Sequence, residues 1–148
     1  MNDDAKLPSL EIDALGYWMD RSFRAMIKTL NESLKEANLD LQHSQFVVLR
    51  RLSVMDGAGQ SELSKILGKN PAAISRSVNY LETKGFVRRE TATCCKYRVF
   101  LTEAGKKLVP KLIEIDDRIT EKALSGFSDK EKKEVKDILN KIYRNSLT

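Results

Sequence analysis

The chain has few of the residues on which small enzymes and secreted domains depend. Its 148 residues include two cysteines, one histidine, three prolines and one tryptophan. The adjacent Cys94 and Cys95 do not make a disulfide framework, which fits a reducing cytoplasm. The single histidine, His43, and the absence of any Cys-x-x-Cys pair argue against a zinc site within one chain. We therefore expect neither a metal nor a cofactor.

Other absences narrow the class of protein. No run of 18 apolar residues predicts a transmembrane helix, and the acidic N-terminal stretch lacks the hydrophobic core of a secretory signal. There is no glycine-rich phosphate loop and no plausible nucleophile–base pair, so we do not expect an enzyme. With 41% hydrophobic and 32% charged residues, the composition is that of a soluble globular chain.

Positive charge is unevenly distributed. Residues 42–101 contain 10 Lys and Arg against 4 Asp and Glu, a net charge of +6, whereas the remainder has a net charge of −1. This excess favours a polyanionic partner for the central segment. Ordinary solubility is the alternative explanation.

Apolar residues that recur at steps of three and four predict helices along most of the chain. Ser61 is expected to cap the third helix, Thr102 the fifth and Ser128 the sixth, and Pro110 should bend or break the fifth. The second helix is expected to use Phe46, Val47, Leu49, Leu52 and Val54 as its apolar face. The predicted helices cover residues 10–37, 46–54, 61–67, 71–84, 102–123 and 129–143.

Two short strands are predicted between the fourth and fifth helices. They cover residues 86–90 and 97–101, with a polar tip at 91–96. Tyr97, Val99 and Leu101 should form an apolar face, opposite Lys96, Arg98 and Phe100. The fold class is therefore mainly α with a small β-wing: a winged helix-turn-helix, the usual reader of duplex DNA.

Long amphipathic helices flank this reader. We expect a flexible tail at 1–9, a dimerisation helix at 10–38, the winged helix-turn-helix at 42–101 and further dimerisation helices at 102–148. The flanking helices have too little core of their own to cover their apolar faces, which favours a homodimer. The alternative is that they pack on the reader within one monomer.

The chain resembles the MarR family of bacterial transcription regulators. The motifs that carry the resemblance are Glu62-Leu63, Pro71-Ala72-Ala73-Ile74-Ser75-Arg76, Leu81-Glu82-x-Lys84-Gly85-Phe86-Val87-x-Arg89 and Leu101-Thr102-Glu103-Ala104-Gly105, with Gln45 and Leu49 matching the second helix. The resemblance implies a dimeric DNA-binding regulator, expected to be a repressor, on a pseudo-palindromic operator. It also implies that a small aromatic ligand, bound between the dimer helices and the reader, weakens DNA binding.

The helix from Pro71 is expected to enter the major groove. Arg76 is the candidate for guanine, with a phosphate contact or an internal salt bridge as the alternative. Gln60 and Ser61 are placed to meet phosphate at a helix N-terminus. The full set of predicted DNA-binding residues is Gln60, Ser61, Asn70, Ala72, Ala73, Ser75, Arg76, Asn79, Arg88, Arg89, Lys96 and Arg98.

The wing tip departs from the family. Where relatives commonly have Asp-Arg-Arg, this chain has Thr93-Cys94-Cys95, so we expect phosphate contacts rather than minor-groove reading. Cys94 and Cys95 lie near Lys96 and Arg98, which favours thiolates and makes them a candidate oxidant sensor. Two ordinary small residues in a turn are the alternative. The missing arginine also leaves open a winged-helix protein-interaction module without specific DNA binding.

Four residues are candidates for lining a ligand pocket: Tyr17, Trp18, Arg21 and Arg51. An aromatic residue at helical spacing needs no ligand to explain it, so the alternative for Trp18 is a place in the hydrophobic core.

Overall fold

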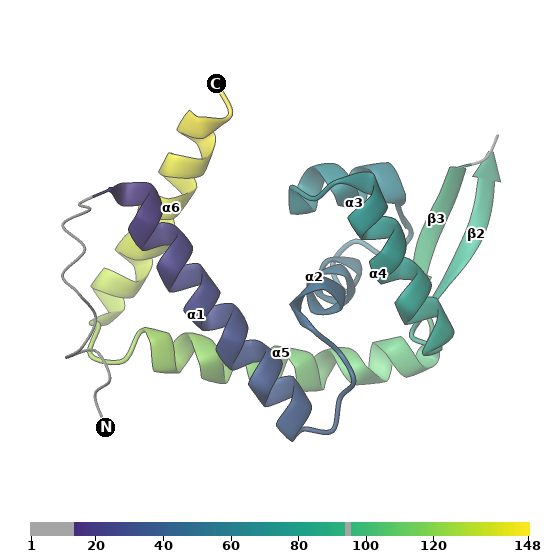
Figure 1. Cartoon of the computed structure of the whole chain (residues 1–148), viewed down its shortest axis with the longest axis horizontal. Helices are drawn as coiled ribbons and strands as arrows, with labels where there is room; N and C mark the ends of the chain where they lie inside the picture. Colours follow the sequence, from purple (N-terminus) through teal and green to yellow (C-terminus); the bar gives the residue numbers. More distant parts are fainter. Residues whose placement is uncertain (1–13, 94–95) are drawn as a thin grey trace.

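The computed structural model of the chain describes residues 14–93 and 96–148. Its described elements follow the predicted order and confirm a mainly α fold with a small β-wing (Figure 1). They are α1 Leu15–Glu36, α2 His43–Leu52, β1 Ala58–Gly59, α3 Gln60–Leu67, α4 Pro71–Thr83, β2 Val87–Thr93, β3 Lys96–Leu101, α5 Glu103–Ala123 and α6 Asp129–Ser146.

The wing is part of a three-stranded antiparallel sheet with the order β1-β3-β2. Val87 pairs with Leu101, and Gly59 pairs with Arg98. The segment between α2 and α3 therefore supplies a strand, β1, which the sequence pattern did not predict. Gly57 permits this turn because its φ is 77°, and its N–H donates to the Val99 carbonyl at 2.9 Å.

Both wing strands are longer than predicted, and their apolar face is shorter. Val99 and Leu101 are buried, but Tyr97 is 46% exposed. The apolar face therefore ends where the strands leave the helices, and Tyr97 lies on the part of the wing that extends beyond the core.

Helix α5 joins the wing to the rest of the molecule (Figure 1). Its predicted cap is confirmed, since the Thr102 hydroxyl accepts from the Gly105 N–H at 3.1 Å. Of the two predicted effects of Pro110, a bend or a break of one turn, the break is wrong, because α5 is continuous from Glu103 to Ala123. Pro110 has no N–H to donate to the Lys106 carbonyl, and both residues are exposed, so this gap in the helical hydrogen bonds lies at the surface.

The core is one cluster that joins the C-terminal half of α1 to the reader and to α5. On α2 the expected apolar face needs correction: Val48 is fully buried, Val47 is half-buried, and Val54 lies past the helix end with 72% exposure. The cluster consists of Leu30, Leu34, Leu41, Phe46, Val48, Leu49, Leu52, Ala58, Leu63, Ile74, Val78, Leu81, Val87, Val99, Leu101, Leu108, Val109, Leu112, Ile115 and Ile119.

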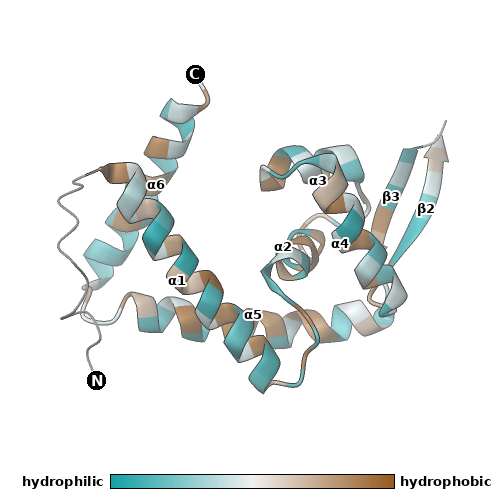
Figure 2. Cartoon of the chain, in the orientation of Figure 1, coloured by the Kyte–Doolittle hydropathy of each residue, from teal (hydrophilic) through white to brown (hydrophobic). Residues whose placement is uncertain are grey.

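Two helical segments lie outside this core. No residue of α6 is buried, and the first half of α1 is equally uncovered. Figure 2 shows hydrophobic residues along both segments. Their exposed large side chains are Leu15, Trp18, Met19, Phe23 and Met26 on α1 and Ile138, Leu139 and Tyr143 on α6. Within the described residues, no helix is long and apolar enough to cross a membrane.

Candidate nucleic-acid interface

Helix α4 presents a polar face outward because its apolar stripe faces the core. Ile74, Val78 and Leu81 are fully buried, as predicted. Pro71 occupies the first turn, and the Asn70 Oδ1 caps the helix by accepting from the Ala73 N–H at 2.7 Å. The remaining face carries the predicted contact residues: Asn70, Ala72, Arg76 and Asn79 are exposed, and Ala73 and Ser75 are half-buried. Among the described residues, no acidic side chain pairs with Arg76.

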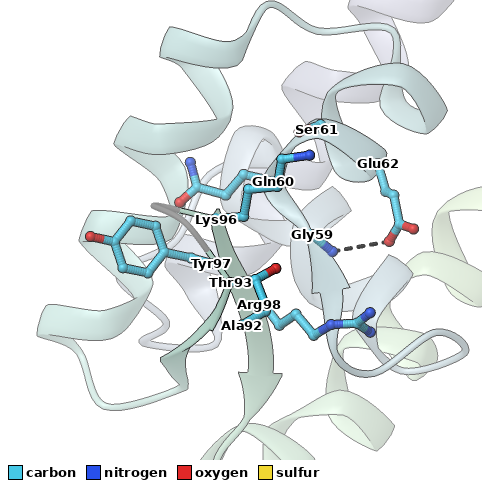
Figure 3. A pocket seen from close by; sticks show the side chains of 9 residues that line it. All are labelled: Gly59, Gln60, Ser61, Glu62, Ala92, Thr93, Lys96, Tyr97 and Arg98. Carbon is cyan, nitrogen blue, oxygen red and sulfur yellow. Dashed lines mark hydrogen bonds between the residues drawn. The ribbon is translucent and has the colours of Figure 1, made fainter.

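Helix α3 begins earlier than the sequence suggested. Gly59 is its N-cap and Gln60 its first residue, so the prediction that Ser61 caps the helix is wrong. The Glu62 carboxylate instead accepts from the Gly59 N–H at 3.0 Å (Figure 3). Because the helix includes Gln60, Glu62 is its third residue. From that position a glutamate side chain can reach back to the N–H of the N-cap residue. The Ser61 side chain is left exposed.

Two adjoining cavities separate the helices from the wing, and we call them together the wing groove. The first, of 420 Å³, lies between the start of α3 and the two wing strands (Figure 3). The second, of 680 Å³, lies between α4 and the wing. Gln60 and Tyr97 line both. The first is lined by Gly59, Gln60, Ser61, Glu62, Ala92, Thr93, Lys96, Tyr97 and Arg98, and the second by Gln60, Ser75, Asn79, Glu82, Arg89 and Tyr97.

Arg89 lies in the second cavity and bonds to three side chains. Its Nε donates to the Gln60 Oε1 at 3.1 Å, and its Nη2 donates to the Asn79 Oδ1 at 2.5 Å. Its Nη1 and its backbone N–H donate to the two carboxylate oxygens of Glu82, at 3.0 and 3.1 Å. The Arg89 side chain is only 17% exposed. This network joins α3, α4 and β2.

Arg88 and Arg98 lie on the face of the strands opposite Arg89, because Arg88 is paired with Phe100 and Arg98 with Glu90. Arg88 points away from Arg89: its guanidinium pairs with Glu90 and lies 4.7 Å from the Phe100 ring centroid. Lys96 and Arg98 line the first cavity, and the Arg98 side chain extends away from Tyr97 (Figure 3). Cys94 and Cys95, the candidate oxidant sensor, lie outside the described residues.

The four candidate ligand-pocket residues do not meet within one chain. Three of them contact one another on α1. The Arg21 Nη1 donates to the Tyr17 hydroxyl at 2.9 Å, and the rings of Tyr17 and Trp18 meet edge to face. Arg51 lines a separate 310 Å³ cavity with Phe46, Val47, Arg50, Val54, Leu67 and Asp116. Trp18 is 51% exposed, so it does not belong to the core of this chain, contrary to the alternative considered for it.

Two side chains beside the winged helix-turn-helix, those of Asp40 and His43, have lowered pKa values. A hydrogen bond from Lys84 lowers the pKa of Asp40, and the Tyr80 hydroxyl donates to the Asp40 carbonyl at 2.7 Å. These contacts attach the link between α1 and α2 to the end of α4. Burial, followed by the charge of Lys69, lowers the pKa of His43. His43 is half-buried at the first position of α2.

Six residues of the wing groove were not identified from the sequence as parts of the site: Gly59, Glu62, Glu82, Ala92, Thr93 and Tyr97. The motif Leu81-Glu82-x-Lys84-Gly85 drew attention to Glu82, but nothing in the linear pattern indicates that Arg89 is its partner. Within the described part of the chain, no three His, Cys, Asp or Glu side chains are grouped to hold a metal ion.

Known proteins resemble this chain in sequence and in fold. Residues 41–93 match the model of the MarR family. The HTH-type transcriptional regulator YybA of Bacillus subtilis is 31% identical over 124 residues, which cover 82% of this chain and 81% of that protein. This relative is a regulator and not an enzyme, as predicted.

Two solved structures extend the likeness over most of the fold. A MarR transcriptional regulator from Methanosarcina mazei Go1 has a TM-score of 0.84 at 28% identity, covering 97% of this chain and 95% of that one. A MarR-family regulator from Listeria monocytogenes, complexed with a 26mer DNA, has a TM-score of 0.82 at 27% identity, covering 90% and 89%.

Proposed function

Because the chain belongs to the MarR family of transcriptional regulators, we propose that it binds duplex DNA in a sequence-specific manner and acts as a repressor. The observation that carries this proposal is the outward face of α4, where Arg76 is exposed and free of any acidic partner among the described residues. Arg76 is therefore available for the O6 and N7 of guanine. The DNA complex of the Listeria regulator supports the same reading.

The wing groove supplies phosphate contacts in this proposal. Lys96 and Arg98 lie on the wing, and Gln60 and Ser61 lie opposite them at the start of α3. Each neutralised phosphate releases counterions, so the logarithm of the binding constant should fall linearly with the logarithm of salt concentration. An affinity that stays flat between low and moderate salt for every duplex would contradict this proposal.

Selection of bound duplexes from a random pool tests the proposal directly. Arg76→Ala should relax preference at one base pair, costing about 1–3 kcal/mol of discrimination. Lys96→Ala should weaken all duplexes equally and reduce the salt slope by about one. The reverse pattern would exchange the two roles. If no sequence is enriched from the pool, the result would favour the alternative, a winged-helix protein-interaction module.

We also propose a homodimer on a pseudo-palindromic operator. The uncovered apolar side chains of α1 and α6 support it, since Phe23 is 53% exposed and Tyr143 is 58% exposed. A folded chain gains little by leaving large aromatic side chains in water, whereas a symmetric partner would cover both helices at once. A two-fold dimer places its readers on half-sites about one helical turn apart.

A small aromatic ligand or an oxidant is the proposed signal. The Arg51 Nε is buried without a hydrogen-bond partner among the described residues, beside the 310 Å³ cavity, which supports an acidic aromatic ligand there. Such a ligand should lose affinity on Arg51→Met. For oxidation, replacing Cys94 and Cys95 together by Ser should abolish any oxidant effect on DNA binding, and an unchanged response would remove the sensor hypothesis.

A further inference from the structure

We infer that Arg89 is a positioning residue that fixes two side-chain amides, Gln60 and Asn79, so that both present N–H donors to DNA. This inference rests on the proposed function. It assigns Arg89 no contact with DNA, although its type and position suggest one. The reason is its burial among internal partners: it is 17% exposed, and each of its three guanidinium nitrogens has an acceptor.

The chemistry of guanidinium dictates how the two amides are oriented. Arginine has five N–H donors and no acceptor, so only the oxygen of a neighbouring amide can face it. Both the Gln60 Oε1 and the Asn79 Oδ1 accept from Arg89, at 3.1 and 2.5 Å. The amide NH₂ groups therefore point away from Arg89. A free amide presents a donor or an acceptor with equal ease, whereas these two are held with their donors outward.

Glu82 neutralises the charge of Arg89 in this arrangement. Its carboxylate, which is 43% exposed, accepts from both the side chain and the backbone of Arg89 and so balances the arginine charge. A neutralised arginine contributes little to attraction for phosphate. Its effect on DNA binding is then mainly geometric, which separates it from Lys96 and Arg76.

The orientation restricts which bases Asn79 can read. A free asparagine recognises adenine with two bonds, donating to N7 and accepting from N6–H. Here the oxygen already accepts from Arg89, which leaves it one lone pair in a fixed direction, so the two-bond contact with adenine is disfavoured for Asn79. Its outward NH₂ suits acceptors only, such as guanine O6 and N7 or thymine O4. Gln60, at the start of α3, would donate to a phosphate oxygen by the same logic.

Arg89→Lys tests the inference while retaining the positive charge. Lysine cannot hold three acceptors in one plane, so both amides become free to rotate. Discrimination at the base pair read by Asn79 should fall about tenfold, with the salt slope unchanged. Arg24→Lys is the matched control, because Arg24 lies on α1, outside the wing groove, where its 76% exposed side chain pairs with Asp20. It should leave discrimination unchanged.

Asn79→Asp provides a second variant that does not depend on Arg89→Lys folding. The carboxylate still accepts from Arg89, but its outward atom becomes an acceptor. Preference at the affected base pair should move to a base that donates, such as cytosine through N4–H. Unchanged preference in both variants, with the wild type still selective, overturns the inference and leaves the proposed function intact. A wild type that selects no duplex overturns the proposed function instead.

A measurement without DNA tests the geometry independently. In the free protein, the side-chain NH₂ signals of Gln60 and Asn79 in a ¹⁵N-resolved NMR spectrum should shift in Arg89→Lys and stay in place in Arg24→Lys. Signals of both amides that do not respond to Arg89→Lys would overturn the inference whatever the DNA results.

Discussion

Gly105 occupies a position where any side chain would collide with the backbone of the wing. A Cβ at Gly105 would lie 2.1 Å from the Phe86 carbonyl oxygen, closer than two such atoms can approach. This close approach explains the glycine that ends the Leu-Thr-Glu-Ala-Gly motif. The backbone around Phe86 cannot move away easily, because the same carbonyl accepts from the Thr102 N–H at 3.1 Å.

Gly105→Ala should therefore destabilise the protein by about 1–3 kcal/mol, the usual cost of overpacking a well-filled site. The measurement is the midpoint of urea unfolding. Gly16→Ala is a suitable control, since a Cβ at Gly16 meets nothing within 4 Å. In a helix that change should be neutral or slightly stabilising. Equal effects of the two substitutions would contradict the proposed collision.

His43 is the residue whose titration should be easiest to follow, because it is the single histidine. Its pKa is lowered in the folded protein by burial and by the charge of Lys69. The folded state then binds this proton less readily than the unfolded state. The stability that His43 contributes is present above about pH 6.5 and is lost as the pH falls through the lowered folded pKa.

The NMR titration of the His43 ring should accordingly show a midpoint below about 6.5. His43→Gln should reduce the loss of stability between neutral and mildly acidic pH, measured by thermal unfolding in matched buffers. A midpoint at or above the ordinary value would show that the ring is not desolvated as the structure indicates.

Individual site residues could be predicted only where their contacts are with residues close in the sequence. The outward face of α4 follows from helical period, because Ile74, Val78 and Leu81 fix which side is inward. The partners of Arg89 do not follow from any period. Gln60 lies 29 residues away and Asn79 lies 10 residues away, and only the packing of α3, α4 and β2 brings them together.

At the scale of elements, the helices were predicted better than the sheet. Caps at Thr102 and Ser128 act over three residues and were read correctly. The two-residue strand β1 has no pattern of its own, since Ala58 and Gly59 become a strand only by pairing with β3. The helix start at Gln60 was missed for a related reason, because Glu62 supplies the cap from inside the first turn.

The recognition helix α4 depends on its own cap. Asn70→Ala removes the acceptor of the Ala73 N–H and should destabilise the protein by about 1 kcal/mol in denaturant unfolding. Asn70→Asp keeps an acceptor at the same place and should retain most of that stability. If Asn70→Asp is as damaging as Asn70→Ala, the cap is not what Asn70 contributes.

At the scale of the whole molecule, the sequence predicted that the first and last helices leave apolar side chains uncovered. It did not predict how many of these side chains would be exposed. The apolar residues of α6 were identified from their spacing, yet none is buried in this chain. Trp18 shows the same effect on α1, where an aromatic residue with the spacing of a core position is 51% exposed. Helical period tells which residues share a face, but not which neighbour covers it.

Ile138→Glu should weaken the proposed dimer, because it places a charge on the apolar face of α6, where Ile138 is 58% exposed. Sedimentation velocity should show a shift from dimer to monomer at micromolar concentration. Asn140→Glu introduces the same charge on the polar side of α6 and should leave the dimer intact. A wild type that sediments as a monomer at all concentrations would contradict the dimer proposal.

Helix α5 is a long, continuous connection between the wing and α1. It begins with Glu103 at the base of the wing, has Gly105 in its first turn, and packs against α1 near its other end, where Ile115 and Ile119 are buried. A helix of 21 residues is roughly 30 Å long, so each degree of tilt displaces its far end by about half an ångström. In the proposed dimer, a rigid helix of this length would convert a small change in its tilt near α1 into an ångström-scale displacement of the wing.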